Sequence, residues 1–572
     1  MSDEIAPTPP ESNVSDGQKM VKATAGIGAF VAVGSALTGL ITKMFLSRIL
    51  GTGAIADAYN YVYGLTQSVF RSWDKLVRPV MLPVLAQERA RVGEKDSWRF
   101  VSSFFNIQAV AIALVVVATM TFAPWIVHAL TEFKKEDVGL TDVLSGRFLL
   151  PASPAAAAPW MAHALAEVRN HQADLAEALA GRYLLFMAPA ILFLALASTG
   201  YLLLNSYKRF QLAAFGDNVF VKLVPLVALL GLYGFFGIYA LIFGVVLGAF
   251  AKLALYAWGL RRELRDFVLR IDFASPAMKH VWWLMVPLSV GVVGAFARDI
   301  IERWFMTNAG GGVVTIVTYS RAPVDVPIQI VPVALSIAIF PFLSDYVARN
   351  RHEQVFDLLG RAFRIVSLVF LPLTVAMVLL ARPVADVVFG GGKFTSEDVR
   401  QTAEAVRWYA LGYLFFGLEI VMLQFFYARR DTITPTWTGI LTSALQIGIL
   451  WAAVDAMGTS TFNMAYSASK AVKVLILGVM LPQAFPHEHL WRELLRRTLP
   501  AVGKVLLVTV VMGGVVWSLN HVLPGGRSLR GLLNLAVTCS AGGIVFVAGV
   551  HFLRVEEWHD ALGWVKAKIK RS

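Results

Sequence analysis

The chain has 572 residues, of which 57% are hydrophobic and only 16% are charged. A soluble domain carries about 25% charged residues, so this composition excludes an ordinary soluble protein and indicates a chain surrounded by lipid. The net charge of +13 does not indicate nucleic-acid binding, because the basic residues lie in short loops between apolar stretches. Cys539 is the one cysteine, so an internal disulfide is excluded, and no Cys or His spacing predicts a metal site.

The chain begins with a polar segment over residues 1–18 that is rich in Pro, Ser, Asp and Glu. It lacks the basic-then-apolar order of a signal peptide, and we expect it to be a disordered cytoplasmic tail.

Fourteen apolar stretches follow, each long enough for a membrane span of about 20 residues. They fall at 23–50, 57–87, 98–130, 182–205, 211–234, 236–259, 278–306, 312–345, 358–381, 402–427, 434–456, 461–484, 498–521 and 529–553. The fold class predicted is an all-α membrane protein with about fourteen transmembrane helices.

Basic residues alternate from loop to loop. Every loop after an even-numbered span is basic, from Arg89 and Arg91 after the second span to Arg492 and Arg496 after the twelfth, and most odd-numbered loops carry almost no Lys or Arg. The positive-inside rule therefore places both termini in the cytoplasm. We predict a multi-pass protein of the bacterial inner membrane.

A weak internal repeat suggests how the spans are grouped. The segment 83–91 echoes 341–349, and both copies run from the end of a span into a basic loop on the same side of the membrane. A parallel repeat of six spans predicts two lobes. The predicted domains are a tail at 1–18, an N-lobe at 19–259 with an extended outer loop at 132–180, a C-lobe at 260–484, and helices 13 and 14 with a basic tail at 485–572.

The second span carries polar residues three or four positions apart, which places them on one face of a helix. They are Tyr59, Tyr63, Gln67, Arg71, Lys75 and Arg78. Asp74 lies beside this stripe, the first span adds Lys43, and the eighth adds Arg321 and Asp325. Ionisable groups at membrane depth usually face a cavity or a partner. One interpretation is a water-filled cationic cavity that suits phosphate; the other is internal ion pairing that holds helices together.

Towards its end, at residues 298–303, the seventh span carries two acids and two bases. Arg298 and Glu302 are four residues apart, as are Asp299 and Arg303, so we expect these two ion pairs within the helix. A glycine run at 390–392 precedes Lys393, but it lacks the spacing and the following Ser or Thr of a phosphate loop.

Several segments in order along the chain resemble the MurJ (MviN) family of lipid II flippases, within the superfamily of multidrug, oligosaccharidyl-lipid and polysaccharide exporters. The matching segments are 47–59, 82–86, 204–210, 392–398, 409–412, 426–428 and 431–435. The resemblance implies two six-helix lobes, no enzymatic activity and no cofactor. It also implies alternating-access flipping of an undecaprenyl-pyrophosphate-linked oligosaccharide, with lipid II as the first candidate.

The resemblance further implies a substrate site. The family places arginines on its first, second and eighth helices against the pyrophosphate. Here those positions hold Thr42, Phe70 and Ala322, while Lys43, Arg71 and Arg321 are each adjacent, a rotation of about 100° on a helix. We therefore expect substrate contacts from a cationic group, with three acids orienting it. The cations are Lys43, Arg71, Lys75, Arg78 and Arg321, and the acids are Asp57, Asp74 and Asp325.

Energy coupling is the last property that the resemblance implies. Some members of the family look to bind sodium, and the corresponding positions here are Glu302, Gln446, Leu450 and Ser467. Leu450 cannot coordinate a cation, so Glu302, Gln446 and Ser467 remain as candidates. Sodium or the membrane potential is the expected driving force. The expected partners are the lipid-linked substrate, membrane lipids and peptidoglycan-synthesis proteins, with no nucleic acid.

Three alternatives remain at this stage. The chain could flip another polyprenyl-linked glycan, export drugs in exchange for cations, or act as a flippase-like scaffold without transport. A cation-drug exporter calls for an acidic cavity, whereas these spans are rich in basic residues.

The predicted topology can be tested by labelling with a membrane-impermeant thiol reagent in a Cys539→Ala background. In intact spheroplasts we expect Trp160→Cys, in the outer loop, to be labelled and Arg265→Cys, in a basic loop, to be protected. The reverse pattern would show that the orientation is wrong.

Overall fold

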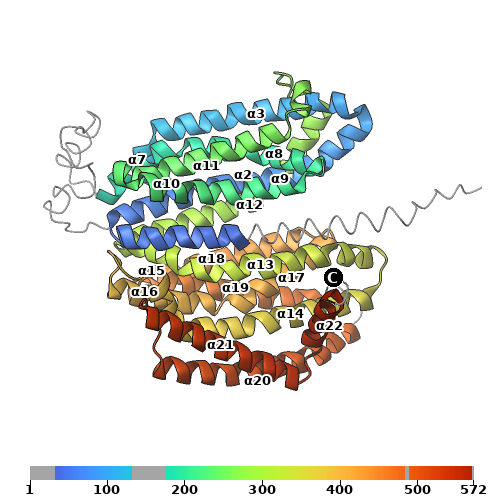
Figure 1. Ribbon diagram of the computed structural model, residues 1–572. Coiled ribbons are helices and arrows are strands. Elements are labelled where there is room, and N and C mark those ends of the chain that lie inside the picture. The colour runs from blue at the N-terminus through green and yellow to red at the C-terminus, as the bar shows by residue number, and fades with distance from the viewer. Residues whose placement is uncertain (1–32, 132–174, 484–487, 570–572) are drawn as a thin grey trace, which may run out of the picture. The chain divides into compact units, whose positions relative to one another are not determined.

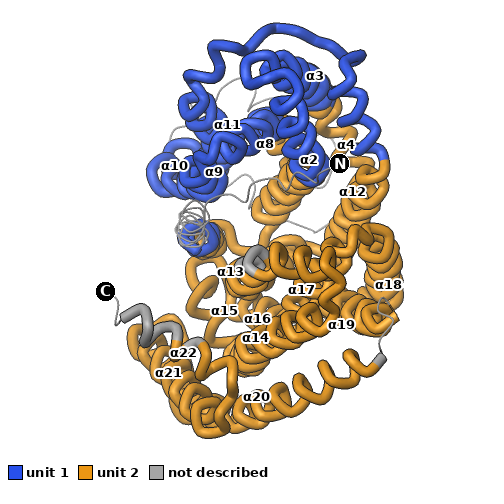
Figure 2. Tube along the Cα trace, turned by 90° about the vertical axis from the view of Figure 1, so that its right-hand side faces the viewer, with its two compact units in different colours: residues 1–39, 73–118, 186–286 blue, residues 40–72, 119–185, 287–572 orange. Residues whose placement is uncertain are grey.

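The computed structural model describes residues 33–131, 175–483 and 488–569. Within these ranges the regular structure is helical, apart from one isolated bridge between Gly391 and Phe394. The prediction of an all-α chain is confirmed. The chain forms two compact units, coloured in Figure 2, and each is discontinuous in sequence. Unit 1 comprises 1–39, 73–118 and 186–286, and unit 2 comprises 40–72, 119–185 and 287–572. The lobes predicted at 19–259 and 260–484 remain a prediction.

Unit 1 is built mainly from helices in the first half of the chain (Figure 1). They are α3 (Glu94–Thr121), α8 (Pro189–Ser206), α9 (Phe210–Phe215), the π-helix η2 (Gly216–Phe220), α10 (Val221–Phe236), α11 (Ile238–Gly259) and the short 3₁₀ helix η3 (Glu263–Asp266). The second part of α2 (Ala54–Val92) and the start of α12 (Pro276–Ala309) also belong to this unit.

Unit 2 holds the first part of α2, most of α12 and the helices that follow. They are α13 (Val313–Ala348), α14 (His352–Leu379), α15 (Ala381–Phe389), α16 (Ser396–Ala410), α17 (Tyr413–Ala428), α18 (Ile433–Met457), α19 (Ser460–Gln483), α20 (Glu488–Val522), α21 (Leu529–Phe552) and α22 (Glu556–Ile569). It also contains α4 (Ala123–Leu130), most of α7 (Leu175–Met187) and part of a helix over Val33–Leu50.

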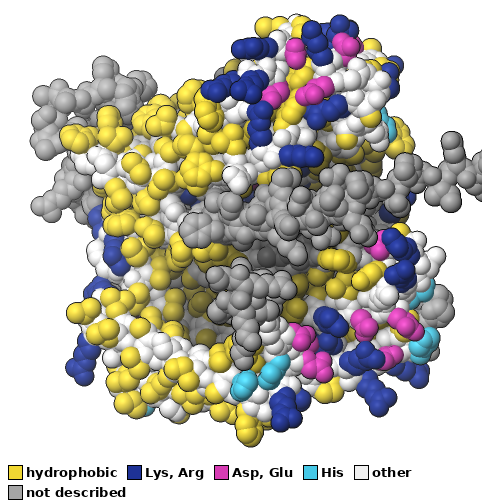
Figure 3. All heavy atoms as spheres, turned by 45° about the vertical axis from the view of Figure 1, so that its right-hand side comes forward, with side chains coloured by type: hydrophobic (Ala, Val, Ile, Leu, Met, Phe, Trp, Pro, Cys, Tyr) yellow, Lys and Arg dark blue, Asp and Glu magenta, His cyan; other side chains and the backbone are white. Residues whose placement is uncertain are grey.

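Twelve helices of the described chain are long and apolar enough to cross a membrane. Two more long helices, α2 with 39 residues and α13 with 36, stand where the sequence predicted the second and eighth spans. Both carry polar residues along their length, so the count of fourteen spans remains a prediction. Hydrophobic side chains cover broad areas in Figure 3, while Lys and Arg gather in clusters, as expected for a protein with lipid-facing sides.

Helix α13 stays helical although Pro323, Pro327, Pro332 and Pro341 lie inside it. Membrane helices tolerate proline where neighbouring helices satisfy the freed backbone groups. This continuity matters because it keeps Arg321 and the residues one turn on either side of it in a fixed helical order.

A tight turn at residues 390–395 packs against the end of the helix over Val33–Leu50. The Lys393 amide donates to the Arg48 carbonyl at 2.9 Å, and the Ser47 hydroxyl donates to the Phe389 carbonyl at 3.0 Å. Gly392 has φ +60°, and a Cβ there would collide with the Arg48 carbonyl. The glycine run is therefore a structural turn that needs residues without a side chain.

Replacing Gly392 by alanine should destabilise unit 2 by about 1–3 kcal/mol, because it adds both left-handed strain and a collision with Arg48. The measurement is the apparent Tm of the purified protein in detergent. Gly514→Ala is the matched control, since Gly514 faces open space in α20. Equal Tm values for the two variants would contradict this role of the turn.

Candidate functional site

The polar stripe predicted on the second span lies on one continuous helix, α2. Exposure rises along it from Tyr59 to Lys75 and falls again at Arg78. Tyr59 is buried and stacks on Tyr63 with ring centroids 5.9 Å apart, whereas Arg71 is exposed. The Nε atom of Arg71 donates to the Gln67 carbonyl one turn earlier, at 3.2 Å. Arg71 is thus exposed, with its Nε bound to its own helix.

Arg321 of α13 is held by two neighbouring helices in unit 2. One terminal nitrogen donates to Glu302 of α12 at 2.5 Å, and Nε donates to the side-chain oxygen of Asn463 in α19 at 2.9 Å. The guanidinium carbon also lies 5.5 Å and 5.1 Å from the ring centroids of Tyr409 and Tyr466. Ion pair, amide and aromatic rings together fix the orientation of this cation.

Lys43 and Asp325 join the same region of unit 2. The Lys43 ammonium donates to the Thr318 carbonyl of α13 at 2.9 Å, one turn before Arg321. Asp325, one turn after Arg321, accepts a 2.9 Å hydrogen bond from Tyr409, and Coulomb interaction links it to Lys43, Arg71 and Arg321. The structure therefore brings together the three cations that the sequence placed on three different helices. We call Lys43, Arg71, Arg321 and Asp325 the cationic cluster.

Asp57 has a different environment from the one expected. Its carboxylate accepts hydrogen bonds from the Gly312 amide at 2.6 Å and from the amide and hydroxyl of Thr315 at 2.9 and 2.6 Å. These donors form the first turn of α13, where unsatisfied amides favour an anion. Asp57 thus caps α13, and the expectation that it orients the cavity cations remains a prediction.

Asp74 and Arg78 lie in unit 1, in a separate ionic network. Arg78 donates to Asp74 at 2.6 Å and lies 3.6 Å from Asp217, which also pairs with Lys252 at 2.6 Å. Lys75, between them on α2, is exposed. Asp217 and Lys252 were not among the residues predicted from the sequence. A charged residue within each of the apolar stretches 211–234 and 236–259 was the signal that could have identified them.

The candidates for ion coupling lie on three helices of unit 2, and each makes a hydrogen bond or ion pair with another protein group. Glu302 pairs with Arg321, the Gln446 side-chain oxygen accepts from Arg298 at 3.3 Å, and the Ser467 hydroxyl donates to the Tyr409 carbonyl at 3.3 Å. In the described part of the chain, no three His, Cys, Asp or Glu side chains cluster as a metal site would need.

The ion pairs expected within the seventh span differ from those observed. Arg298 pairs with its neighbour Asp299, and Glu302 reaches across to α13 instead of back along its own helix. Tertiary contacts override helical spacing here because a buried carboxylate gains more from a fixed guanidinium on another helix than from a pair that its own helix can offer.

A second ionic cluster in unit 2 lies close to Tyr466. Glu419 of α17 accepts from Lys470 and Lys473 of α19, each at 2.8 Å. The Lys470 ammonium lies 5.4 Å from the centre of the Tyr466 ring, and the Arg298 guanidinium lies 5.5 Å from it. Cations thus outnumber acids in both clusters, so this part of the unit favours an anionic ligand.

Comparison with known proteins identifies relatives of this chain. The family model described as "Lipid II flippase MurJ" matches residues 153–532, more than half of the chain. The lipid II flippase MurJ of Burkholderia cenocepacia is 25% identical over 70% of this chain and 72% of its own length. The probable lipid II flippase MurJ of Rhizobium meliloti is 22% identical, over 85% of this chain and 83% of its own.

Solved structures agree on the fold. The chain resembles a lipid II flippase MurJ in an inward closed conformation, with a TM-score of 0.71 and 17% identity over 92% of this chain and 98% of that one. An inward-facing multidrug resistance transporter of the MATE family gives a TM-score of 0.59 at 12% identity, over 78% of this chain and 96% of that one.

The cap on α13 can be tested by Asp57→Asn. The variant keeps the shape of the side chain but loses its charge and one acceptor, which should cost about 1–3 kcal/mol at a buried position. We expect faster hydrogen exchange of the amides at 312–315 and a lower apparent Tm. Asp345→Asn, at an exposed position at the other end of α13, is the control. Unchanged exchange at 312–315 would contradict the cap.

Proposed function

The chain belongs to the lipid II flippase MurJ family of transporters, and from this premise we propose that it carries lipid II across the bacterial inner membrane by alternating access. The observation that carries the proposal is the cationic cluster, in which Lys43, Arg71 and Arg321 all lie near enough to Asp325 to act on it electrostatically. The ligand in this proposal is the pyrophosphate that joins the sugar head group to its polyprenyl chain.

The chemistry of the cluster suits a pyrophosphate. Guanidinium groups bind phosphate oxygens through paired N–H donors, and charge-assisted hydrogen bonds contribute about 1.5–3 kcal/mol each. Arg71 is exposed, while Arg321 is oriented in advance by Glu302 and Asn463. Asp325 keeps the empty cluster from repelling itself. The three cations would then hold the anion while the lipid tail stays in the bilayer.

Contacts near the start of α13, on the side that the predicted topology places outside, support a state that is closed to the outside. Besides the cap from Asp57 to α13, the Thr52 hydroxyl donates to Asp398 at 2.8 Å, and the Asn60 amide donates to the Thr315 hydroxyl at 3.2 Å. Under the predicted topology these residues lie near the outer surface. We propose that they form the outer gate and separate when the site opens outwards, with both termini staying in the cytoplasm.

Of the alternative functions, exchange of cationic drugs is disfavoured, because a drug cation would meet a cluster whose charge is positive. An assembly with peptidoglycan-synthesis proteins would fit the lipid II substrate, and its test is co-purification from the host membrane.

The driving force that we propose is the membrane potential. Arg298 and Arg321 donate to the oxygens of Gln446 and Glu302 that a sodium ion would need. The potential acts on any charge that moves through the membrane, with about 2.3 kcal/mol per elementary charge per 100 mV. If the cationic cluster moves through the membrane field during alternating access, its net charge couples flipping to the membrane potential.

Replacing Na⁺ by choline should therefore leave the flipping rate in proteoliposomes unchanged, whereas dissipating the potential should lower it several-fold. The rate is measured as exposure of the head-group amine to a membrane-impermeant reagent. Loss of flipping in choline with the potential maintained would contradict this coupling and favour a sodium site.

The cationic cluster itself is tested by Arg71. We expect Arg71→Ala to abolish head-group exposure and growth in a depletion strain, with protein level and helix content unchanged, because the residue is exposed and packs little. Arg71→Lys should keep part of the activity, since the charge remains without the planar pair of donors.

The matched control is Arg99→Ala, another exposed arginine, on α3, which should be close to wild type. Arg321→Ala would leave Glu302 as an unpaired buried acid, so it is tested together with Glu302→Gln. Normal head-group exposure in both Arg71→Ala and the double variant would rule out the cluster as the substrate site.

A further inference from the structure

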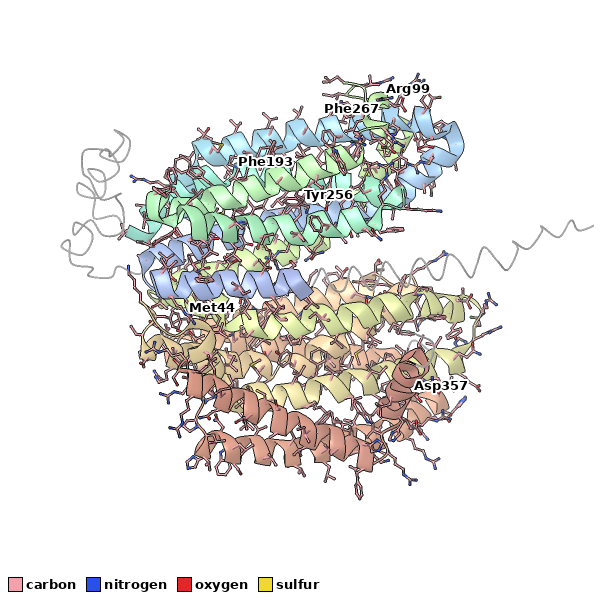
Figure 4. All side chains as sticks on the ribbon, in the orientation of Figure 1. Met44, Arg99, Phe193, Tyr256, Phe267 and Asp357 are labelled. Carbon is pink, nitrogen blue, oxygen red and sulfur yellow. The ribbon has the colours of Figure 1, made fainter. Side chains whose placement is uncertain are left out.

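A small polar pocket in unit 2 lies apart from the cationic cluster, between the first turns of α14 and α20. Its volume is about 200 Å³, and its polar walls are Glu353, Asp357 and Arg364 from α14 and Glu493, Arg497 and Thr498 from α20. Figure 4 labels Asp357, which marks this end of α14 close to α22. None of these residues takes part in the transport mechanism described above.

The charges in the pocket follow an order along each helix. On α14 the acids Glu353 and Asp357 come before Arg364, and on α20 Glu493 comes before Arg497. Arg497 bridges Asp357 at 3.1 Å and Glu493 at 2.5 Å, whereas Glu353 has no ion-pair partner among the described residues. The pocket therefore has an acidic end towards the starts of both helices and a basic end deeper along them.

The basic end contains a buried hydroxyl without a partner. Thr498 is 8% exposed, and its oxygen makes no hydrogen bond within the described structure. The missing side chain of Gly360 opens the space beside it: a Cβ there would lie 3.5 Å from the Thr498 oxygen and 3.4 Å from a terminal nitrogen of Arg364. A hydroxyl and a guanidinium nitrogen facing one gap are suited to an anionic oxygen.

The position of the pocket indicates where its ligand comes from. Both α14 and α20 contain candidate membrane spans, and both start beside basic loops, so under the predicted topology the pocket lies at the cytoplasmic interface of the bilayer. A phospholipid in that leaflet has its phosphate deeper and its amine nearer the cytoplasm. This is the order of the pocket, with Arg364 and Thr498 deeper and Glu353 nearer the cytoplasm.

We propose that this pocket binds the head group of phosphatidylethanolamine, with the phosphate at Arg364 and Thr498 and the ammonium at Glu353 and Asp357. A primary ammonium has three N–H donors for these carboxylates, and a choline head group has none. Arg364 also donates through Nε to Glu557, a buried residue of α22. The Arg364 guanidinium would thus contact the lipid phosphate and also hold α22 against α14.

The test compares binding of short-chain phosphatidylethanolamine and phosphatidylcholine to the purified full-length protein by native mass spectrometry. We expect one tightly bound phosphatidylethanolamine and at least roughly tenfold weaker binding of phosphatidylcholine, which corresponds to about 1.4 kcal/mol. Gly360→Ala should reduce the affinity for phosphatidylethanolamine by a similar factor, because its Cβ fills the gap at ordinary contact distances without disturbing the helix.

The matched control is Gly503→Ala in α20, where a Cβ meets open space and binding should be unchanged. Thr498→Val is the second variant, since it removes only the hydroxyl and should also weaken binding. Equal affinity for the two lipids would overturn the proposal, and so would binding of phosphatidylethanolamine that neither Gly360→Ala nor Thr498→Val weakens.

Discussion

A charged side chain at membrane depth must be paired or hydrated, since leaving it alone in hydrocarbon costs several kcal/mol. The pair between Arg321 and Glu302 meets this constraint at the point where α12, α13 and α19 come together. Asn463 completes the arrangement: it accepts from Arg321 and donates to the Ser320 hydroxyl and the Ala405 carbonyl, each at 2.8 Å. The placement of these helices, and with it the direction of the Arg321 guanidinium, depends on this one set of contacts.

The same constraint operates in unit 1 with different residues. Lys252 is 1% exposed, and it is tolerated because Asp217 lies 2.6 Å away. Asp217 belongs to the π-helix over 216–220, a wider turn of the kind that often marks functional positions in helices. Each unit thus has its own ionic centre.

The proposed mechanism requires that some cations remain available to the ligand. Arg321 is fixed by an acid, an amide and two tyrosine rings, so it is oriented but only partly available. Arg71 is exposed, and among the described residues its hydrogen bond is to its own helix, so it can meet a ligand without first breaking an ion pair. One cation that is held and one that is accessible allow an anion to bind tightly and still leave, as a transporter needs.

The sequence by itself determined the all-α membrane class, because span length and the absence of charge are properties of single segments. It also placed the stripe on α2, since spacing along one helix decides which residues share a face. It could not assign partners between helices: Glu302 was expected to pair with Arg298 on its own helix and pairs with Arg321, and Asp57 caps α13. Asp217 and Lys252 were missed for the same reason. Ion-pair partners depend on which helix faces come together, and only tertiary packing decides that. In a buried site, one fixed partner stabilises a charged side chain more than several exposed partners do.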